Sequence, residues 1–311
     1  MDRKGAAVLG VSLAAAALVA ASAPDLSAIH AARWLAPGAD RVRALSTIWS
    51  ECLTRPQTPE AAYWVEVGRA AFRTPLLLGG QAARAGLSCD SCHQDGRNNP
   101  DFLFPGVSGA PGTATRAALL SSHPADGIDH PKLIPDLSGP KASLKQDQGP
   151  ASGVLEPFVH GLVTEEFDGA EPPAAVIKGL GAYVRALSPA ACPSHTRQPL
   201  TAELYLDNSR RAANAAVGAL DRKDWDTAAF LAEAARSPLG LIYERFDQPS
   251  ADAARAALHA SDLELAADAD AIRAHDPRSR ERLIAWLAES RAWAQVIARE
   301  EPGSLFNPKR L

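Results

Sequence analysis

A five-residue motif at residues 89–93, Cys-Asp-Ser-Cys-His, constrains what this chain can fold around more than any other part of its sequence. The spacing C-x-x-C-H is that of c-type haem attachment. The two cysteine sulfurs bond to the haem vinyl groups, and the adjacent histidine becomes the proximal iron ligand. A thioredoxin-like C-x-x-C would need a βαβ setting, whereas the flanks here indicate a helix and a loop rich in glycine and proline. We therefore predict one covalently attached haem c per chain, bound by Cys89, Cys92 and His93.

The N-terminus has the organisation of an export signal. Arg3 and Lys4 precede an uncharged run over residues 5–24, and Ala21-Ser22-Ala23 has the small-x-small pattern of a signal-peptidase site. We expect residues 1–23 to be a signal peptide and the rest of the chain to be periplasmic or otherwise exported, because covalent haem attachment takes place outside the cytoplasm. A run of this length could also span a bilayer. A retained membrane anchor, with the protein facing the periplasm, is therefore the alternative.

Two cysteines, Cys52 and Cys192, lie outside the motif. In an oxidising compartment, an even number of remaining cysteines favours a disulfide. These two bracket the region around the motif, so a bridge between them would join its two ends. Two unrelated buried thiols are the alternative that the sequence leaves open.

Composition divides the exported chain into an N-terminal extension, residues 24–57, and two parts of domain size. Residues 58–195 hold the motif and many turn-forming residues, and residues 196–311 are rich in alanine and poor in glycine. The predicted fold class is mainly α, with a haem domain that has long loops followed by an all-helical C-terminal domain. The net charge of −4 and the lack of a basic stripe argue against a nucleic-acid partner.

Helical periodicity and capping residues predict the main helices. In the haem domain, Thr58, Pro59 and Glu60 form a helix start, and apolar residues recur on one helical face through residue 72. A second helix is expected over residues 172–187, and the stretch 96–153 is rich in turn residues. In the C-terminal domain the expected helices are residues 201–220, 224–235, 250–260 and 277–300.

Two patterns around the motif resemble the crossed terminal helices of cytochrome c domains. Gly68-x-x-x-Phe72 precedes the motif, and Leu180-x-x-Tyr183 follows it. The resemblance implies a cytochrome c-like haem domain in which glycine lets the helices approach and the aromatic rings pack across the crossing. Separately, we expect Gly181 inside the second helix to permit a close helix crossing, because a glycine inside a helix otherwise costs stability.

The segment from Gly68 to His93 is similar to the bacterial di-haem cytochrome c peroxidase family. That family shows a Gly-x-x-x-aromatic helix, then Pro and Leu, a glycine-containing turn and a Ser-Cys-x-x-Cys-His close. These elements stand here as Gly68, Phe72, Pro75, Leu76, Gly86, Ser88, Cys89, Cys92 and His93. The similarity covers residues 60–190. One difference is large, since this chain has a single C-x-x-C-H motif where the peroxidases carry two haems.

The sixth iron ligand is the main question that the sequence leaves open. The only methionine is Met1, within the export segment, so the usual His/Met pair is excluded for the mature protein. A second histidine, a lysine or an open position remains. Three histidines lie between the motif and the end of the haem domain. We rank His123 first as the distal ligand, His160 second and His130 third.

The sixth ligand decides the function. Two imidazoles would saturate the iron, and the chain would then be an electron carrier that needs a redox partner protein. An open or labile position would suit a peroxidase-like oxidoreductase, with Glu165, Glu166 or Asp168 as a possible acid–base group. A haem-based sensor acting through the helical domain is a weaker alternative. The single motif and the missing methionine favour the electron carrier, and no catalytic residue is assigned.

Overall fold

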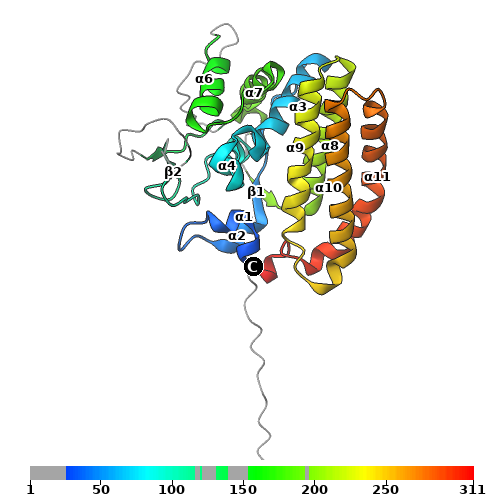
Figure 1. The fold of residues 1–311 in the computed structure, drawn as a ribbon. Helices are drawn as coiled ribbons and strands as arrows, with labels where there is room; N and C mark the ends of the chain where they lie inside the picture. The colour runs from blue at the N-terminus through cyan, green and yellow to red at the C-terminus, as the bar shows by residue number, and fades with distance from the viewer. Residues whose placement is uncertain (1–25, 116–119, 121–130, 139–152, 193–195) are drawn as a thin grey trace, which may run out of the picture.

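The computed structural model describes residues 26–115, 120, 131–138, 153–192 and 196–311, and these residues are mainly helical. Two groups of helices lie on either side of a long central helix, α3 (Pro59–Arg73) (Figure 1). The predicted mainly α class is confirmed at this level. The predicted signal peptide, residues 1–23, lies outside the described residues. Among the helices that are described, none combines the length and the apolar character needed to cross a bilayer.

Long helices are joined by short helices and by two-stranded ribbons. The short elements are α1 (His30–Arg33), α2 (Arg41–Ser46), β1 (Thr47–Trp49), α4 (Gly80–Arg84), α5 (Cys89–Cys92), β2 (Thr113–Ala114), β3 (Lys132–Leu133), α6 (Leu155–Gly161) and β4 (Arg197–Pro199). The long helices after α3 are α7 (Ala174–Ala186), α8 (Ala202–Asp221), α9 (Trp225–Tyr243), α10 (Asp252–Arg273) and α11 (Ser279–Glu300). Strand β1 pairs antiparallel with β4, and β2 pairs antiparallel with β3.

Helix α3 begins where its capping residues predict. The Thr58 hydroxyl accepts a hydrogen bond from the Ala61 N–H at 3.1 Å, and Pro59 takes the first helical position. Glu60 lies in the first turn, where a negative charge is favoured by the helix dipole. The helix ends before Pro75, because the residue before a proline is disfavoured in helical conformation.

Helices α3 and α7 cross with their backbones in direct contact. A Cβ added to Gly68 would overlap the carbonyl group of Gly179, and a Cβ added to Gly179 would lie 2.7 Å from the Val67 side chain. Only glycine on both helices allows this approach. Gly181 does not take part in this crossing, because it faces the Glu156 side chain of α6.

Aromatic rings pack across this crossing, as the cytochrome c resemblance implies. The ring centroids of Phe72 and Tyr183 are 5.1 Å apart. The apolar core around them draws on α3, α7 and the segment after α6, and consists of Val65, Ala71, Leu77, Val163, Val176, Ile177, Leu180 and Leu187. Because α5 lies between α3 and α7 in the sequence, this core restricts where the motif can lie.

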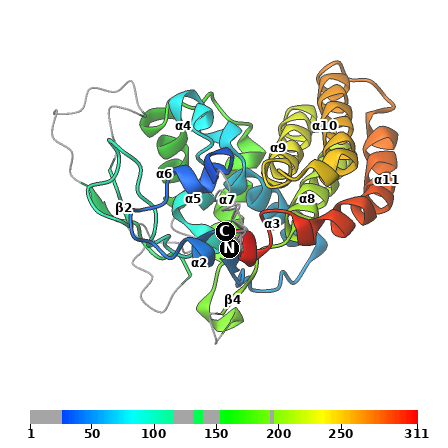
Figure 2. The same ribbon diagram turned by 90° about the horizontal axis from the view of Figure 1, so that it is seen from below.

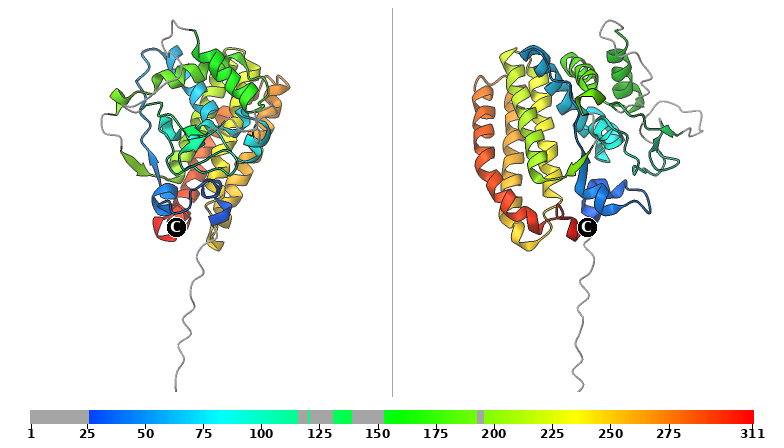
Figure 3. Two further views of the ribbon diagram at one scale, coloured as in Figure 1. Left: turned by 90° about the vertical axis from the view of Figure 1, so that its left-hand side faces the viewer. Right: turned by 180° about the vertical axis from the view of Figure 1, so that it is seen from behind.

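Helices α8 to α11 form a bundle beside α3 (Figures 1 and 3). Its interior is dominated by small side chains, including the fully buried Ala213, Ala216, Ala228, Ala232 and Ala269. The buried Trp286 donates its indole N–H to the Ser261 hydroxyl at 2.8 Å, so its one polar atom is satisfied. The alanine-rich composition noted in the sequence therefore corresponds to closely packed helices.

Two of these helices run further than predicted. Helix α9 continues past residue 235 to Tyr243 despite Pro238, and α10 continues past residue 260 to Arg273. A proline inside a helix costs roughly 3 kcal/mol. Leu239 and Ile242, which follow it, are both buried. Burial of such side chains contributes roughly 1.5–3 kcal/mol each, which offsets the cost of the proline.

The central helix α3 also belongs to the core of the bundle. Tyr63 and Val67 pack among side chains of α8 and α9. Glu66 accepts two hydrogen bonds from the Arg211 guanidinium of α8, at 2.5 and 2.7 Å. The predicted boundary between residues 195 and 196 therefore separates two parts of the chain that share one helix.

The N-terminal extension packs against the C-terminal part of the chain. Ile29 and Leu45 form a small buried cluster with Leu305, and Figure 2 shows the C-terminal segment beside α2. A disulfide joins Cys52, after β1, to Cys192, before β4, with an S–S distance of 2.23 Å. The predicted pairing of these two cysteines is thus present, and it closes the region that contains the motif.

Replacing Gly68 with alanine is expected to destabilise the fold. The added methyl group would overlap the Gly179 backbone, and overpacking of this kind costs roughly 1–3 kcal/mol, occasionally more. Thermal unfolding followed by circular dichroism should show a lower Tm for Gly68→Ala. The matched control is Gly240→Ala in α9, where nothing lies within 4 Å of the added Cβ. That variant should keep or raise the Tm, because alanine favours helix. An unchanged Tm in Gly68→Ala would contradict the crossing.

Candidate functional site

The motif forms the short helix α5, and its neighbours close both ends of that helix. The Ser88 N–H donates to the Ser91 hydroxyl at 3.0 Å, and the reciprocal bond to the Ser88 side chain completes a capping box. At the other end, Asn99 donates its side-chain amide to the Ser91 carbonyl at 3.0 Å and its backbone N–H to the Cys92 carbonyl at 2.9 Å. These bonds fix the direction in which the motif side chains extend.

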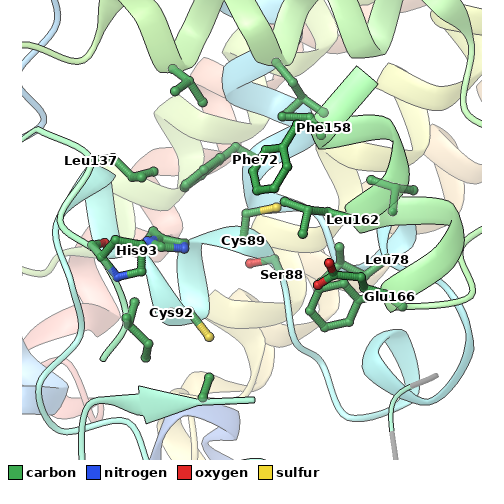
Figure 4. Close-up of a pocket in the computed structure, with 18 of the residues that line it drawn as sticks. Phe72, Leu78, Ser88, Cys89, Cys92, His93, Leu137, Phe158, Leu162 and Glu166 are labelled. Carbon is green, nitrogen blue, oxygen red and sulfur yellow. The ribbon is translucent and has the colours of Figure 1, made fainter. Parts of the chain in front are cut away.

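Both cysteines and the histidine of the motif line one cavity of about 280 Å³ (Figure 4). The other walls come from α3, α7, α6, the π-helical turn η4 (Leu162–Glu166) and the segment around β3. Their apolar members include Phe72, Leu78, Leu120, Ile134, Leu137, Leu155, Phe158, Val159, Leu162, Val163, Phe167, Leu180 and Val184. An apolar cavity with a few convergent polar groups is the usual form of a cofactor site.

The His93 imidazole is oriented by a backbone carbonyl. Its Nδ1 lies 2.9 Å from the Pro135 carbonyl oxygen, which can only accept, so Nδ1 carries the proton and Nε2 keeps its lone pair. Burial lowers the pKa of His93 to about 4, although the Pro135 carbonyl and Asp136 act in the opposite direction. The imidazole is therefore neutral near pH 7. Neutral imidazole is the form that binds metals, and a ligating histidine usually donates its other N–H in this way.

The two motif cysteines are free thiols on the wall of the same cavity. Burial raises the pKa of Cys89 and that of Cys92 to about 12, so both sulfurs are protonated at neutral pH. Figure 4 shows both sulfurs and the His93 ring extending from one short helix. Two thiols and one oriented imidazole beside an apolar cavity fit the donor set of a haem c.

Beneath α5, a buried network of charges joins the motif region to α3 and α7. Arg73 donates to Glu51, to Asp95 and to the Tyr183 hydroxyl, at 2.8, 2.5 and 3.1 Å. Glu51 also accepts from Arg69 and from the Tyr183 hydroxyl, each at 2.8 Å. Burial acts to raise the pKa of Glu51, but the two guanidinium groups outweigh it and hold that pKa at about 2. At Asp95 burial dominates and raises the pKa to about 7 despite Arg73.

The α6 wall of the cavity is the part of the site that sequence analysis missed. Its cavity-facing residues are Leu155, Phe158, Val159, Leu162, Val163 and Glu166, which recur at the spacing of one helical face. That periodicity was present in the sequence and could have been used. The role of the Pro135 carbonyl could not have been found in this way. Every residue has a backbone carbonyl, so no residue type identifies the one that accepts from His93.

The described residues bring none of the three ranked histidines to the cavity. His123 and His130 lie outside the described residues. His160 is on α6, but its Nε2 lies 2.8 Å from a carboxylate oxygen of Glu171, and it is not among the residues that line the cavity. Sequence analysis also left a lysine open as the sixth ligand, and one lysine, Lys132, lines the cavity.

Of the three acidic residues considered for acid–base chemistry, one reaches the cavity. Glu166 lines it, and Figure 4 shows its carboxylate across the cavity from His93. Glu165 and Asp168 are not among the lining residues. The structure therefore distinguishes Glu166 from its neighbours, which the sequence alone could not do.

No protein-family model, curated protein or solved structure matches this chain. In the described parts of the chain, no group of three or more His, Cys, Asp or Glu side chains could hold a bare metal ion. A haem needs no such group, because the porphyrin supplies the in-plane ligands of its own iron. The fit to a haem therefore depends on the cavity, the two thiols and His93.

Acid is expected to destabilise the fold through Glu51. Its pKa is lowered from 4.5 to about 2 in the folded protein, so its stabilising contribution is full above pH 4.5 and is lost as the pH falls towards 2. Glu51→Gln removes one partner of a buried ion pair and should lower the free energy of unfolding by roughly 3–5 kcal/mol at pH 7. The loss should be smaller near pH 2, where about half of the wild-type carboxylates are protonated.

Urea unfolding at the two pH values measures this difference. The control is Glu203→Gln, since Glu203 pairs with Arg210 but has a side chain that is 67% exposed. Exposed pairs contribute at most about 1 kcal/mol, so this variant should remain close to wild type. An equal loss for Glu51→Gln at both pH values would show that the charge of Glu51 is not what stabilises the network.

Proposed function

We propose that the chain is an exported mono-haem c-type cytochrome that transfers electrons. The observation that carries this proposal is the placement of Cys89, Cys92 and His93, which extend from one short helix into an apolar cavity. A haem c bound there supplies one-electron chemistry at its iron. Each residue of the motif has a separate part in holding such a group.

The chain's own residues attach, orient and insulate the cofactor in this proposal. The two thiols provide the covalent links, and His93, held through Nδ1 by the Pro135 carbonyl, presents Nε2 as the ligand nitrogen. The apolar walls exclude water and lower the local dielectric constant. Burial, hydrogen bonding to the ligand and the identity of the sixth ligand together set the reduction potential.

A cytochrome c-like arrangement of residues 58–195 is part of the proposal. The glycine crossing of α3 and α7, the contact between Phe72 and Tyr183, and the position of α5 between these two helices support it. The likeness to the di-haem peroxidase family concerns the sequence around the motif. We propose one haem per chain, because the sequence has one C-x-x-C-H motif.

Export to an oxidising compartment is supported by the Cys52–Cys192 disulfide, since such bonds persist there. We keep His123, the histidine ranked first from the sequence, as the proposed sixth ligand, although it lies outside the described residues. Two imidazole ligands would saturate the iron and leave no free position for a substrate. Electron exchange with a partner protein is then the available chemistry.

Expression with a haem c maturation system is expected to give a chain that carries one covalently bound haem. Intact-mass spectrometry should show the added mass, and Cys89→Ala/Cys92→Ala should abolish it. In the oxidised protein, low-temperature EPR should show a low-spin signal, because two imidazoles impose a strong ligand field. His123→Ala should convert this signal to high spin.

The control for His123 is His259→Ala, since His259 is on α10, in the bundle. That variant should keep the low-spin signal. A wild-type chain with no covalent haem would refute the proposed function. A low-spin signal that survives in His123→Ala would leave the cytochrome in place and exclude His123 as the ligand.

A peroxidase-like activity is the second candidate, and the placement of Glu166 favours it. Glu166 is the last residue of η4, and π-helical turns are frequent at functional sites. A carboxylate across the cavity from His93 could take a proton from one oxygen of hydrogen peroxide and deliver it to the other oxygen, which leaves as water when the O–O bond breaks. The remaining oxygen would become a second water with two protons from solvent and two electrons that a redox partner protein supplies through the haem. This role requires an open or labile sixth iron position.

Glu166→Gln tests this candidate, because it keeps the shape of the side chain and removes the proton acceptor. Where the haem-loaded wild type reduces peroxide, kcat/KM should fall by roughly 10²–10⁴ in the variant, with haem content unchanged. Glu165→Gln is the matched control on the same turn, and it should retain activity. Equal rates for wild type and Glu166→Gln would remove Glu166 from the chemistry.

A further inference from the structure

The acceptor for His93 belongs to a short segment that we call the proximal strap, residues 134–138. Its second residue, Pro135, provides the carbonyl oxygen that accepts from His93 Nδ1 at 2.9 Å. Nothing else in the strap contacts the imidazole through a hydrogen bond in the part of the chain that the structure describes. The position of this one carbonyl therefore depends on what holds the strap in place.

Backbone hydrogen bonds hold the two ends of the strap. The N–H groups of Leu137 and Ser138 donate to the Gly96 carbonyl at 2.9 and 3.1 Å, and the Ile134 N–H donates to the Gly112 carbonyl at 3.0 Å. Gly96 has a φ of +82°, which glycine adopts readily. These bonds lie on either side of Pro135 and Asp136, so the middle of the strap needs a further contact.

An ion pair between Arg97 and Asp136 supplies that contact. The Arg97 Nε donates to Asp136 Oδ2 at 3.0 Å and lies 2.8 Å from Oδ1. The two side chains are only 15% and 16% exposed, so the pair is screened much less by solvent than a surface pair. Asp136 adjoins Pro135 in the chain, and Arg97 follows the motif by four residues. The pair thus joins the strap directly to the motif side of the site.

The Arg97 guanidinium is itself held in place by an aromatic ring. It lies over the Trp49 ring of β1 with its Cζ 5.3 Å from the centroid, and the Arg197 guanidinium of β4 lies 4.8 Å from the same centroid. Arg197 also donates to the Thr47 hydroxyl and carbonyl, at 2.7 and 2.9 Å. The β1–β4 ribbon therefore orders the side chain that holds the strap.

We propose that Arg97 and Asp136 are positioning residues that hold the Pro135 carbonyl against His93 and thereby tune the reduction potential of the iron. This inference rests on the proposed haem function and deepens it. A hydrogen bond from Nδ1–H to a carbonyl makes a histidine ligand more basic. A more basic ligand favours the ferric state, so a loosened strap should raise the potential.

The test compares Asp136→Ala and Arg97→Ala in the haem-loaded protein. If the pair acts by positioning, both variants loosen the strap, and both raise the potential. If only through-space charge mattered, losing Asp136 would raise the potential and losing Arg97 would lower it. We expect both variants to shift the ratio of reduced to oxidised protein in the same direction by up to tenfold, which corresponds to about 59 mV for one electron.

Further measurements separate positioning from damage to the fold. Asp136→Asn keeps an oxygen acceptor for Arg97, so its potential should lie closer to that of the wild type than the potential of Asp136→Ala does. Arg310→Ala breaks another arginine–aspartate pair, with Asp247 near the C-terminus, and should leave the potential unchanged. Shifts of opposite sign in Asp136→Ala and Arg97→Ala, or no shift in either, would overturn the proposal.

A readout that does not need the cofactor distinguishes failure of this inference from failure of the proposed function. Amide hydrogen exchange in the cofactor-free chain should be at least tenfold faster at Leu137 and Ser138 in Asp136→Ala and in Arg97→Ala than in the wild type. Unchanged exchange at both amides would show that the ion pair does not hold the strap. Faster exchange in a chain that never binds haem would confirm the mechanical role of the pair, refute the tuning of a potential and refute the proposed function.

Discussion

The contact between the backbones of α3 and α7 determines where every other part of the site can lie. Because Gly68 and Gly179 allow the two helices to touch, the rings of Phe72 and Tyr183 meet across the crossing. Phe72 is then a wall of the cavity, and the Tyr183 hydroxyl reaches the Glu51 carboxylate below it. The close contact of the two helices therefore positions both the apolar wall of the cavity and the buried charges around Glu51.

The charged groups around Arg73 hold the motif through residues that do not line the cavity. Burying charged groups costs free energy, and close pairing returns only part of it. The bonds are nonetheless directional, since Arg73 binds Asp95, and the Asp95 N–H in turn donates to Asp90 within the motif at 2.9 Å. Asp95 has a φ of 49°, which is uncommon for a residue other than glycine. The network therefore fixes the backbone conformation of the turn that follows the motif. Apolar packing, which is not directional, would fix it less specifically.

Features that depend on local sequence could be predicted, and features that depend on a distant partner could not. The start of α3 follows from Thr58 and Pro59, which cap the helix from adjacent positions. Local sequence does not show which glycine of α7 lies at the crossing. Gly179 and Gly181 differ by about 200° around the helix, and only the position of α3 decides between them. The end of α9 was misjudged for a similar reason, since burial of Leu239 and Ile242 in the bundle outweighs the local effect of a proline. The motif residues of the site were identified by spacing, whereas the wall formed by α6 and η4 required attention to a short helix that directly follows the turn-rich stretch.

Helix α3 contributes side chains to two hydrophobic cores, with Phe72 in the core of the crossing and Val67 in that of the bundle. A helix of this kind cannot unfold in one core while it stays folded in the other. We therefore expect the two parts of the chain to be thermodynamically linked and to unfold together. Any group that binds in the cavity and favours the folded state stabilises the bundle by the same free energy. Resistance of α8–α11 to proteolysis, far from the motif, would then report whether the cavity is filled.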